Sequence, residues 1–484
     1  MNRRLFLHAL GTLPFAAAAP ALPTQQRSTA ARAGSRKPNV LFILVDDLGG
    51  TDLACYGADL HETPHLDRLA LESTRFTHAY AAAPVCSPTR ASILTGKYPA
   101  RLHMTVWRED TLRPPANNRK LAPPRATTDL PLAETTLAET LRDSGYRTAH
   151  IGKWHLGDAA HYPEQQGFDF NLGGTLWGAP QTFFYPWRGN KRYGGEPRYV
   201  PGIRDGKPGD YLPDRLTDEA LAFLDRAGDE PFFLNLWYYT VHTPIEGKPE
   251  LVDYYKRKRK EGMSHQNAGY AAMVHNMDEN VGRVLAKLEE KGLAENTIVV
   301  FTSDNGGFVN DFDNEAVTNN APLRSGKGSL YEGGIRVPLM VRSPGLPKGK
   351  VCDVPVVSID FYPTLAELTG VPIPDAQRAT MDGVSFAGLL KNPGVASPRP
   401  LFFHYPHYYP TTTPVGAVIA GDWKLLEFFE DGHTELYNLR EDPSEARDVS
   451  SVERGRAESL QRLLSGWRQA VKAQMPEKNA AAAP

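Results

Sequence analysis

The sequence contains few cysteines and carries almost no net charge. Only 3 of its 484 residues are cysteines, so the fold is not built on a disulfide framework. The formal net charge at pH 7 is −2, which leaves no general excess of cations to hold a phosphate backbone. We therefore expect no nucleic acid partner. Hydrophobic residues make up 41% of the chain, as in ordinary globular proteins.

Long apolar runs are missing after the N-terminal segment, so we expect no stable membrane span. Residues 1–35 begin with Arg3-Arg4, and an apolar stretch, an alanine-rich stretch and a polar linker follow. This order is typical of a secretory signal peptide, and the paired arginines resemble the bacterial twin-arginine type. These features predict an exported protein, either periplasmic or secreted.

Apolar runs of strand length alternate with amphipathic segments of helical period. The runs predict strands buried on both faces, at Asn39–Val45, Tyr146–Ile151, Pro231–Trp237 and Thr297–Phe301. The amphipathic segments predict helices at Thr135–Ser144, Thr217–Arg226 and Tyr270–Lys291. This alternation indicates an α/β fold with a large, mostly parallel sheet flanked by helices.

The character of the sequence changes after residue 375. Val415–Phe429 and Thr434–Leu439 predict the two strands of a hairpin around Glu430–Gly432, and residues 452–472 predict a final helix. We therefore expect four parts along the chain. They are a signal peptide and linker at 1–35, a catalytic α/β domain at 36–375, a C-terminal α+β subdomain with antiparallel strands at 376–475, and a disordered tail at 476–484.

Polar side chains follow each predicted strand of the sheet. They are Asp46, His155, His242 and Asp304. In open α/β sheets ligands bind beyond the carboxyl ends of the strands, so these four residues are expected to meet at one site. The long loops at 107–131 and 178–213 are expected near that site. Asp46-Asp47 and Asp304-Asn305 offer the oxygen ligands that calcium prefers, although such pairs are also common in turns.

One motif is more specific than these pairs. Cys86-Ser87-Pro88-Thr89-Arg90, followed closely by Thr95-Gly96, resembles the signature of the formylglycine-dependent (type I) sulfatases of the alkaline-phosphatase-like superfamily. The resemblance spans roughly residues 37–445 and includes four further blocks, in the same order along the chain as in the family. These blocks are Gly152–Gly157, His242–Pro244, Ser303–Gly307 and Gly326–Gly328.

The resemblance implies a sulfuric ester hydrolase whose nucleophile is a formylglycine, made from Cys86 by a formylglycine-generating enzyme. The hydrated aldehyde offers two hydroxyl groups, one to attack sulfur and one to expel the bound sulfate. The resemblance also implies a calcium ion, with the ligands Asp46, Asp47, Asp304, Asn305 and the modified Cys86. Because exported bacterial members often act on sulfated carbohydrates, such a carbohydrate is the expected substrate.

The same resemblance assigns roles to the remaining polar residues of the motifs. Lys153 and Lys327 would bind the sulfate oxygens, and Arg90 would hold the formylglycine and its neighbouring carboxylates. His155 would take the proton that triggers sulfate release, and His242 would protonate the departing alcohol.

Other interpretations stay open from the sequence. Cys86 could form a disulfide with Cys55. The protein could be a related phosphonate monoester hydrolase or phosphodiesterase, or a sulfated-glycan-binding protein with an unconverted Cys86. The basic run at 256–260 is typical of a solvated face, and it could also bind a polyanionic glycan.

Overall fold

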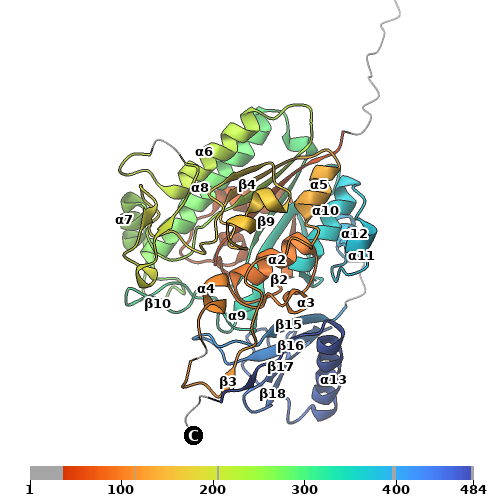
Figure 1. Cartoon of the computed structure of the whole chain (residues 1–484). Helices are drawn as coiled ribbons and strands as arrows, with labels where there is room; N and C mark the ends of the chain where they lie inside the picture. Colours follow the sequence, from red (N-terminus) through yellow and green to blue (C-terminus); the bar gives the residue numbers. More distant parts are fainter. Residues whose placement is uncertain (1–35, 115, 204–205, 395–398, 481–484) are drawn as a thin grey trace, which may run out of the picture. The chain divides into compact units, whose positions relative to one another are not determined.

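A computed structural model describes residues 36–114, 116–203, 206–394 and 399–480, and a sheet of nine strands lies at its centre (Figure 1). The strand order is β13 (Lys350–Cys352), β2 (Thr74–Tyr80), β12 (Arg336–Arg342), β9 (Thr297–Ser303), β1 (Asn39–Val45), β8 (Phe232–Trp237), β4 (Arg147–Gly152) and β5 (Phe170–Leu172), with β14 (Val356–Val357) paired to β2. Neighbours are parallel from β9 to β5, whereas β12 is antiparallel to both β9 and β2. The predicted α/β fold is confirmed.

Strand β1 shows why an uninterrupted apolar run becomes a central strand. Leu41 and Ile43 pack into the core on one face of the sheet, whereas Val40 and Phe42 pack into the core on the other. Successive side chains of a strand point to opposite faces, so a strand covered on both sides must be apolar at every position.

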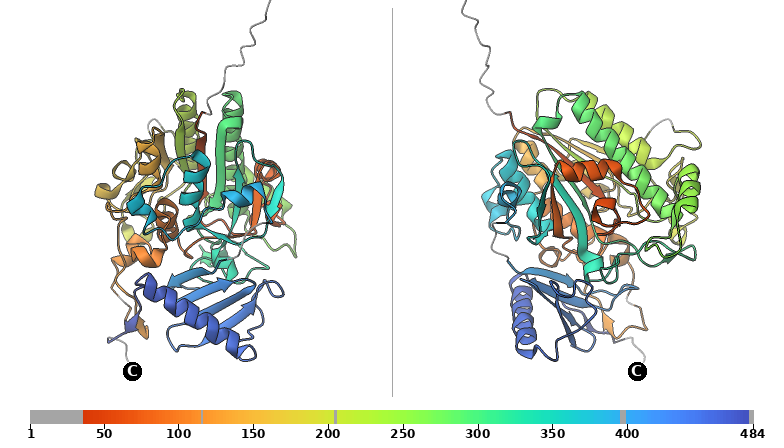
Figure 2. Two further views of the ribbon diagram at one scale, coloured as in Figure 1. Left: turned by 90° about the vertical axis from the view of Figure 1, so that its right-hand side faces the viewer. Right: turned by 180° about the vertical axis from the view of Figure 1, so that it is seen from behind.

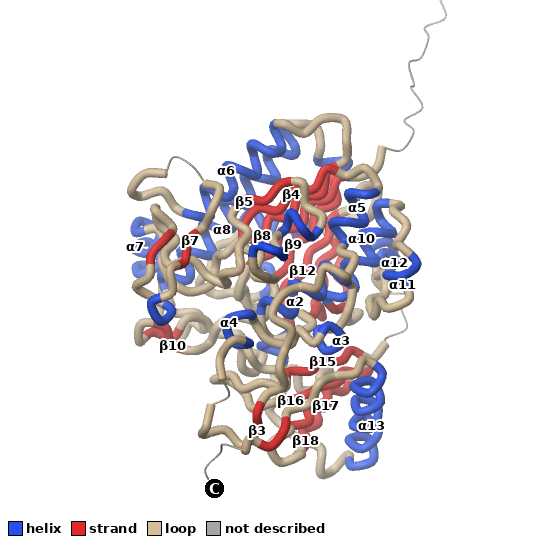
Figure 3. The backbone as a smooth tube through the Cα atoms, viewed as in Figure 1, coloured by secondary structure: helices blue, strands red, loops and turns tan. Residues whose placement is uncertain are grey.

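Helices cover both faces of this sheet (Figures 1 and 2). One core includes side chains of α1 (Pro64–Leu71), α6 (Leu212–Asp225) and α8 (Ala268–Glu290). The opposite core includes side chains of α2 (Cys86–Thr95), α5 (Leu137–Asp143), α10 (Phe361–Thr369) and α12 (Ala387–Lys391). Shorter or peripheral helices are α3 (Pro99–Leu102), α4 (Arg108–Thr111), α7 (Pro249–Lys258), α9 (Glu332–Ile335) and α11 (Asp375–Arg378). Figure 3 shows the strands of the large sheet surrounded by helices and by long loops.

The predicted helices are present, with shifted ends. Helix α8 begins at Ala268 because the Asn267 side chain accepts a hydrogen bond from the backbone N–H of Tyr270. Helix α6 begins at Leu212, so the predicted start at Thr217 is wrong. The Thr217 hydroxyl donates to a backbone carbonyl one turn earlier, inside the helix, and does not cap it.

The C-terminal part forms an antiparallel sheet of β15 (Leu401–Tyr405), β16 (Val415–Ala420), β17 (Trp423–Phe428) and β18 (Thr434–Asn438). Helix α13 (Arg454–Ala470) packs on it (Figure 2). The single strand predicted over Val415–Phe429 is wrong, because Gly421 adopts a positive φ of 59° and turns the chain between β16 and β17.

Short strand pairs complete the described chain. They are β3 (Leu121–Ala122) with β19 (Glu477–Lys478), β6 (Arg188–Gly189) with β7 (Arg198–Tyr199), and β10 (Asp311–Phe312) with β11 (Glu315–Ala316). Strand β19 lies in the segment for which the sequence predicts a disordered tail. The predicted signal peptide at 1–35 lies outside the described residues. None of the helices that the structure describes has both the length and the apolar character that a membrane crossing needs.

Candidate active site

The candidate site lies at the carboxyl edge of the parallel strands. Val45 of β1 is the register partner of Ser303 of β9, so Asp46 and Asp304, the residues that follow, come together. Lys153 directly follows β4, on the other side of β8, and its ammonium group reaches Asp46. The structure thus brings together residues that are distant in the sequence. This was expected, because each of them follows the carboxyl end of a strand in the same sheet.

Cys86 is the first residue of α2, and its thiol faces the site. Its Sγ lies 3.3 Å from Nδ1 of His155. The segment before the helix is fixed by Thr89, whose hydroxyl accepts from the backbone N–H of Ala83 and donates to its carbonyl. Burial alone would raise the pKa of Cys86, but the positive charges of Lys153 and His155 lower it to about 6. Cys55, Cys86 and Cys352 are all free thiols, so the Cys55–Cys86 disulfide is not formed.

Arg90 and Lys153 neutralise two carboxylates beneath this thiol. The guanidinium group of Arg90 is fully buried, and its Nε and Nη2 both lie 2.8 Å from Oδ2 of Asp304. Its Nη1 donates to the backbone carbonyl of Lys153 at 3.0 Å. The Lys153 ammonium group lies 2.6 Å from Oδ2 of Asp46. Because charges without partners are costly to bury, these pairs hold the motif in place.

Asp47 connects a second set of polar groups. It accepts hydrogen bonds of 2.8 Å from the Lys327 ammonium group and from the Asn305 amide. Nε2 of His242 lies 3.6 Å from Oδ2 of Asp47. Burial opposes ionisation of Asp47, but Lys327 and His242 hold its pKa well below the usual range. Asp47 is therefore an anion that links Lys327, Asn305 and His242.

Several oxygens of the site converge in a way that suits a cation. Asp46, Cys86 and Asp304 offer ligand atoms that all lie within 4.8 Å of one another, and so do Asp46, Asp47 and His242. Oδ1 of Asp46 and Oδ1 of Asn305 are buried and accept no hydrogen bond. A bound cation would satisfy both oxygens, and a mostly oxygen donor set fits a hard ion such as calcium.

The two histidines of the site have different environments. Burial, followed by the nearby Lys327 ammonium group, lowers the pKa of His242 to about 3, so its imidazole is neutral in the free protein. Burial also acts against a proton on His155, but the adjacent Glu109 carboxylate outweighs this effect and raises its pKa. His155 is therefore the histidine that accepts a proton more readily.

A cavity of about 200 Å³ opens onto these groups. Its lining includes Cys86, His155, His242 and Lys327, together with residues that sequence reasoning missed. The missed residues are Trp107, Glu109, Arg113, Gly178, Ala179, Tyr193, Arg198, Phe308 and Tyr409. Most of them come from the two long loops expected near the site. Length and composition indicated these loops, but no pattern indicated which of their side chains face the cavity.

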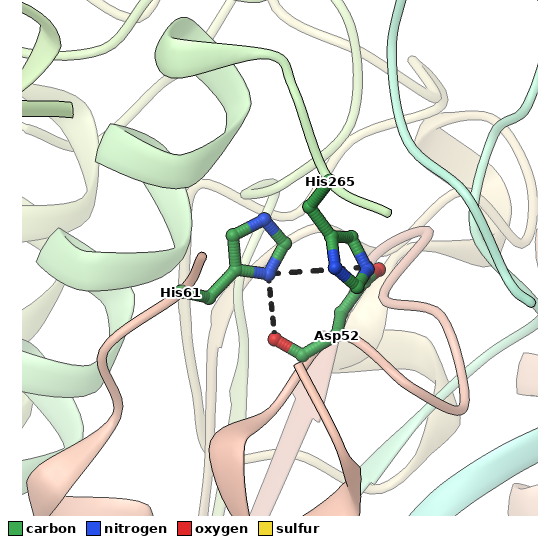
Figure 4. A group of neighbouring side chains, drawn as sticks. All are labelled: Asp52, His61 and His265. Carbon is green, nitrogen blue, oxygen red and sulfur yellow. Dashed lines mark hydrogen bonds and ion pairs between the residues drawn. The ribbon is translucent and has the colours of Figure 1, made fainter. Parts of the chain in front are cut away.

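A second buried cluster of Asp52, His61 and His265 lies apart from this cavity (Figure 4). Its carboxylate already accepts hydrogen bonds from the hydroxyls of Tyr270 at 2.6 Å and Thr318 at 2.8 Å, and it lies 3.3 Å from Nε2 of His265. Nδ1 of His61 lies 2.8 Å from the backbone carbonyl of Asp52. Both carboxylate oxygens therefore already have hydrogen-bond partners, and these contacts fix the loop after β1.

The basic run at 256–260 also lies away from the cavity lining. Lys256 pairs with Asp253, and Lys258 pairs with Glu62. These pairs agree with the solvated face that such runs usually form.

Comparison with known proteins identifies the family to which this site belongs. Residues 38–371 match the family model described as Sulfatase. The chain belongs to the sulfatase family. Residues 326–470 of this sulfatase also match the family model described as N-sulphoglucosamine sulphohydrolase, C-terminal.

Similar proteins match this sulfatase over most of its length. A sulfatase of Formosa agariphila is 33% identical over 490 residues, covering 88% of this chain and 87% of that protein. The steryl-sulfatase of Mus musculus is 35% identical over 446 residues, covering 77% and 68%. The crystal structure of Ps i-CgsB in complex with k-i-k-neocarrahexaose is 30% identical, with a TM-score of 0.74 and coverage of 89% and 92%. The protein is a sulfuric ester hydrolase.

Proposed function

We propose that this sulfatase hydrolyses sulfate esters of carbohydrates, with a formylglycine derived from Cys86 as nucleophile and with a calcium ion in the site. The observation that carries the proposal is the cluster at the strand ends. There, the buried thiol of Cys86, the first residue of α2, faces His155. Paired carboxylates and cationic side chains surround it. An anionic ester needs this combination of a nucleophile with several positive groups around its oxygens.

Charge balance supports both a cation and an anionic substrate. The carboxylates Asp46, Asp47 and Asp304 are offset by Arg90, Lys153 and Lys327, all of them buried. A divalent cation added to this neutral set would leave excess positive charge, which a sulfate monoester would neutralise. The ligands would be Asp46, Asp47, Asp304, Asn305 and the modified Cys86. Calcium bound there would polarise the sulfate and favour ionisation of an adjacent hydroxyl.

The first chemical step transfers the sulfuryl group to the hydrate of formylglycine 86. One hydroxyl of the hydrate would give its proton to a neighbouring carboxylate, such as Asp304, and form a bond to sulfur, and the bond from sulfur to the ester oxygen would break. Lys153 and Lys327 would hold the sulfate oxygens, and Lys327 lines the cavity. The negative charge of a bound ester would favour a proton on Nε2 of His242, which would then pass to the departing alcohol.

The second step restores the aldehyde. The remaining hydroxyl of the sulfated hydrate gives its proton to Nδ1 of His155, and its oxygen forms the carbonyl double bond. The bond from carbon to the sulfate oxygen breaks, and sulfate leaves with the electron pair. The Sγ atom of Cys86 marks the place where the oxygens of the modified residue would lie, and it is within reach of Nδ1.

The carbohydrate assignment rests on the lining of the cavity and on one relative. Trp107 and Tyr409 contact each other edge to face, with ring centroids 5.8 Å apart, and both line the cavity. Exposed aromatic faces pack well against sugar rings, and Arg113 on the same cavity suits a further anionic group. Ps i-CgsB, which is 30% identical, was solved in complex with k-i-k-neocarrahexaose. The twin-arginine-like segment at 1–35 supports export to the periplasm or beyond.

The proposal is tested at Cys86. The protein is produced with and without a formylglycine-generating enzyme, and the mass of the peptide that carries residue 86 is compared with turnover of a sulfated oligosaccharide. Activity should follow conversion. Cys86→Ala should be inactive, whereas Cys86→Ser should gain one covalent sulfate and stop after about one turnover, because no second hydroxyl can expel it.

Multiple turnover by either variant would contradict the proposal. Binding of the oligosaccharide without any hydrolysis by the converted protein would instead support a glycan-binding protein. A preference for a phosphonate monoester over the sulfate would support the related phosphonate hydrolases.

A further inference from the structure

Glu109 extends the contact between Cys86 and His155 into a chain of three residues. Its Oε2 lies 2.6 Å from Nε2 of His155, while Nδ1 of the same ring faces Cys86 at 3.3 Å. Glu109 lies in the short helix α4, outside the sequence motifs that define the family. Its side chain is 9% exposed and that of His155 only 3%, so solvent does not screen this pair as it screens a surface ion pair.

Surrounding groups fix both members of the pair. Oε1 of Glu109 accepts a hydrogen bond from the backbone N–H of Gly178 at 3.3 Å and lies 3.4 Å from Nη2 of Arg198. Gly178 also makes room for the imidazole, because a Cβ atom at this position would lie 2.3 Å from Cε1 of His155. These contacts hold the Glu109 carboxylate against Nε2 of the His155 ring.

We propose that Glu109 is the positioning residue for His155 in the release of sulfate, an inference that rests on the proposed function. By accepting the hydrogen of Nε2, the carboxylate leaves the lone pair on Nδ1, the nitrogen that faces residue 86. The same carboxylate stabilises the imidazolium that forms when Nδ1 takes the proton of the sulfated hydrate. A neutral partner at position 109 would stabilise that charge less.

A purely structural ion pair predicts a different outcome. If Glu109 only anchored α4, its loss would change stability and substrate binding, and both chemical steps would slow together. If Glu109 acts through His155, only the second step should slow, since His155 serves the release of sulfate. The covalent sulfate ester would then accumulate in a variant that still carries formylglycine.

The test compares Glu109→Gln with Glu196→Gln in fully converted protein. Glu196 also pairs with Arg198, at 2.7 Å, but it contacts neither His155 nor the cavity, and its side chain is 40% exposed. An aryl sulfate with a coloured leaving group separates the steps, because the phenolate is released in the first and sulfate in the second.

Glu109→Gln should show a burst of about one phenolate per enzyme, followed by a steady rate at least about tenfold below that of the wild type. Intact mass during turnover should show one added sulfate, and KM should fall with kcat. Glu109→Asp, which keeps the charge, should recover part of the steady rate, and Glu196→Gln should behave as the wild type.

Two results would overturn the inference while leaving the proposed function intact. One is a steady rate for Glu109→Gln within about twofold of the wild type. The other is a slower rate with neither a burst nor a sulfated enzyme. If the wild type itself shows no turnover of any sulfate ester, the proposed function fails, and the comparison of variants is not needed to show it.

Discussion

Removal of one carboxylate should separate the role of Asp304 in the fold from its proposed role as a calcium ligand. Asp304→Asn keeps the size of the side chain and removes the charge opposite Arg90, whose Nε and Nη2 both lie 2.8 Å from Oδ2. Breaking a buried pair on one side costs about 3–5 kcal/mol, because the other charge stays buried without a partner. Asp46, at 3.7 Å from the guanidinium group, compensates only in part.

Asp304→Asn should also lose the stabilisation that calcium gives to the wild type. Calcium at one hundred times its Kd stabilises a protein that binds it only when folded by about 2.7 kcal/mol. Chemical unfolding of the wild type should therefore shift to higher denaturant when calcium is added, and the midpoint for Asp304→Asn should not move. Isothermal titration with calcium gives an independent measurement of the same loss.

Asp360→Asn is the matched control. Asp360 is a buried carboxylate paired with Arg399, outside the site, so this variant should lose stability and keep the full response to calcium. Equal calcium-induced shifts in the wild type and in Asp304→Asn would refute the assignment of Asp304 as a ligand. Full activity of the wild type after exhaustive chelation would refute a role for calcium altogether.

Two further predictions concern the acid and the C-terminal sheet. His242→Ala should lose much more rate on a sugar sulfate than on an activated aryl sulfate, whose phenolate leaves without protonation; equal losses would argue against the assigned role. Lys424 is fully buried and lies 2.9 Å from both Glu332 and Glu445, so Lys424→Met should cost about 3–5 kcal/mol in the free energy of unfolding. The same change at the exposed Lys256 should cost under about 0.5 kcal/mol, and similar losses at both positions would contradict the buried network.

The sequence could predict those parts of the fold that a local pattern dictates. Val40 to Leu44 are apolar at every position because β1 is covered on both faces, and a continuous run of this kind is visible without a structure. The strands β2 and β12 were missed. Thr74–Tyr80 mixes buried and half-buried positions, and nothing in that segment shows that it pairs antiparallel with Arg336–Arg342, far along the chain.

Some residues of the candidate site could likewise be predicted from the sequence, and others could not. Asp46 and Asp304 were predictable because each follows a strand, and parallel strands that are neighbours must end at the same edge. Glu109 and Arg198 follow no strand and stand in no recognisable motif. Their places depend on how two long loops fold over the site, and that depends on contacts between distant residues such as Gly178 with Glu109.

The energetics of the site also indicate why it contains so many buried charges. Arg90, Lys153 and Asp304 are fully buried, and the cost of removing such charges from water commonly exceeds what their attraction returns. Apolar side chains would have stabilised this edge of the sheet at least as well. Oδ1 of Asp46 and Oδ1 of Asn305 even remain without hydrogen bonds, which adds to the cost. The arrangement therefore does not serve the stability of the free protein. Under the proposed function, its charges would become useful when a cation satisfies the free oxygens and an anionic ester meets the ammonium groups.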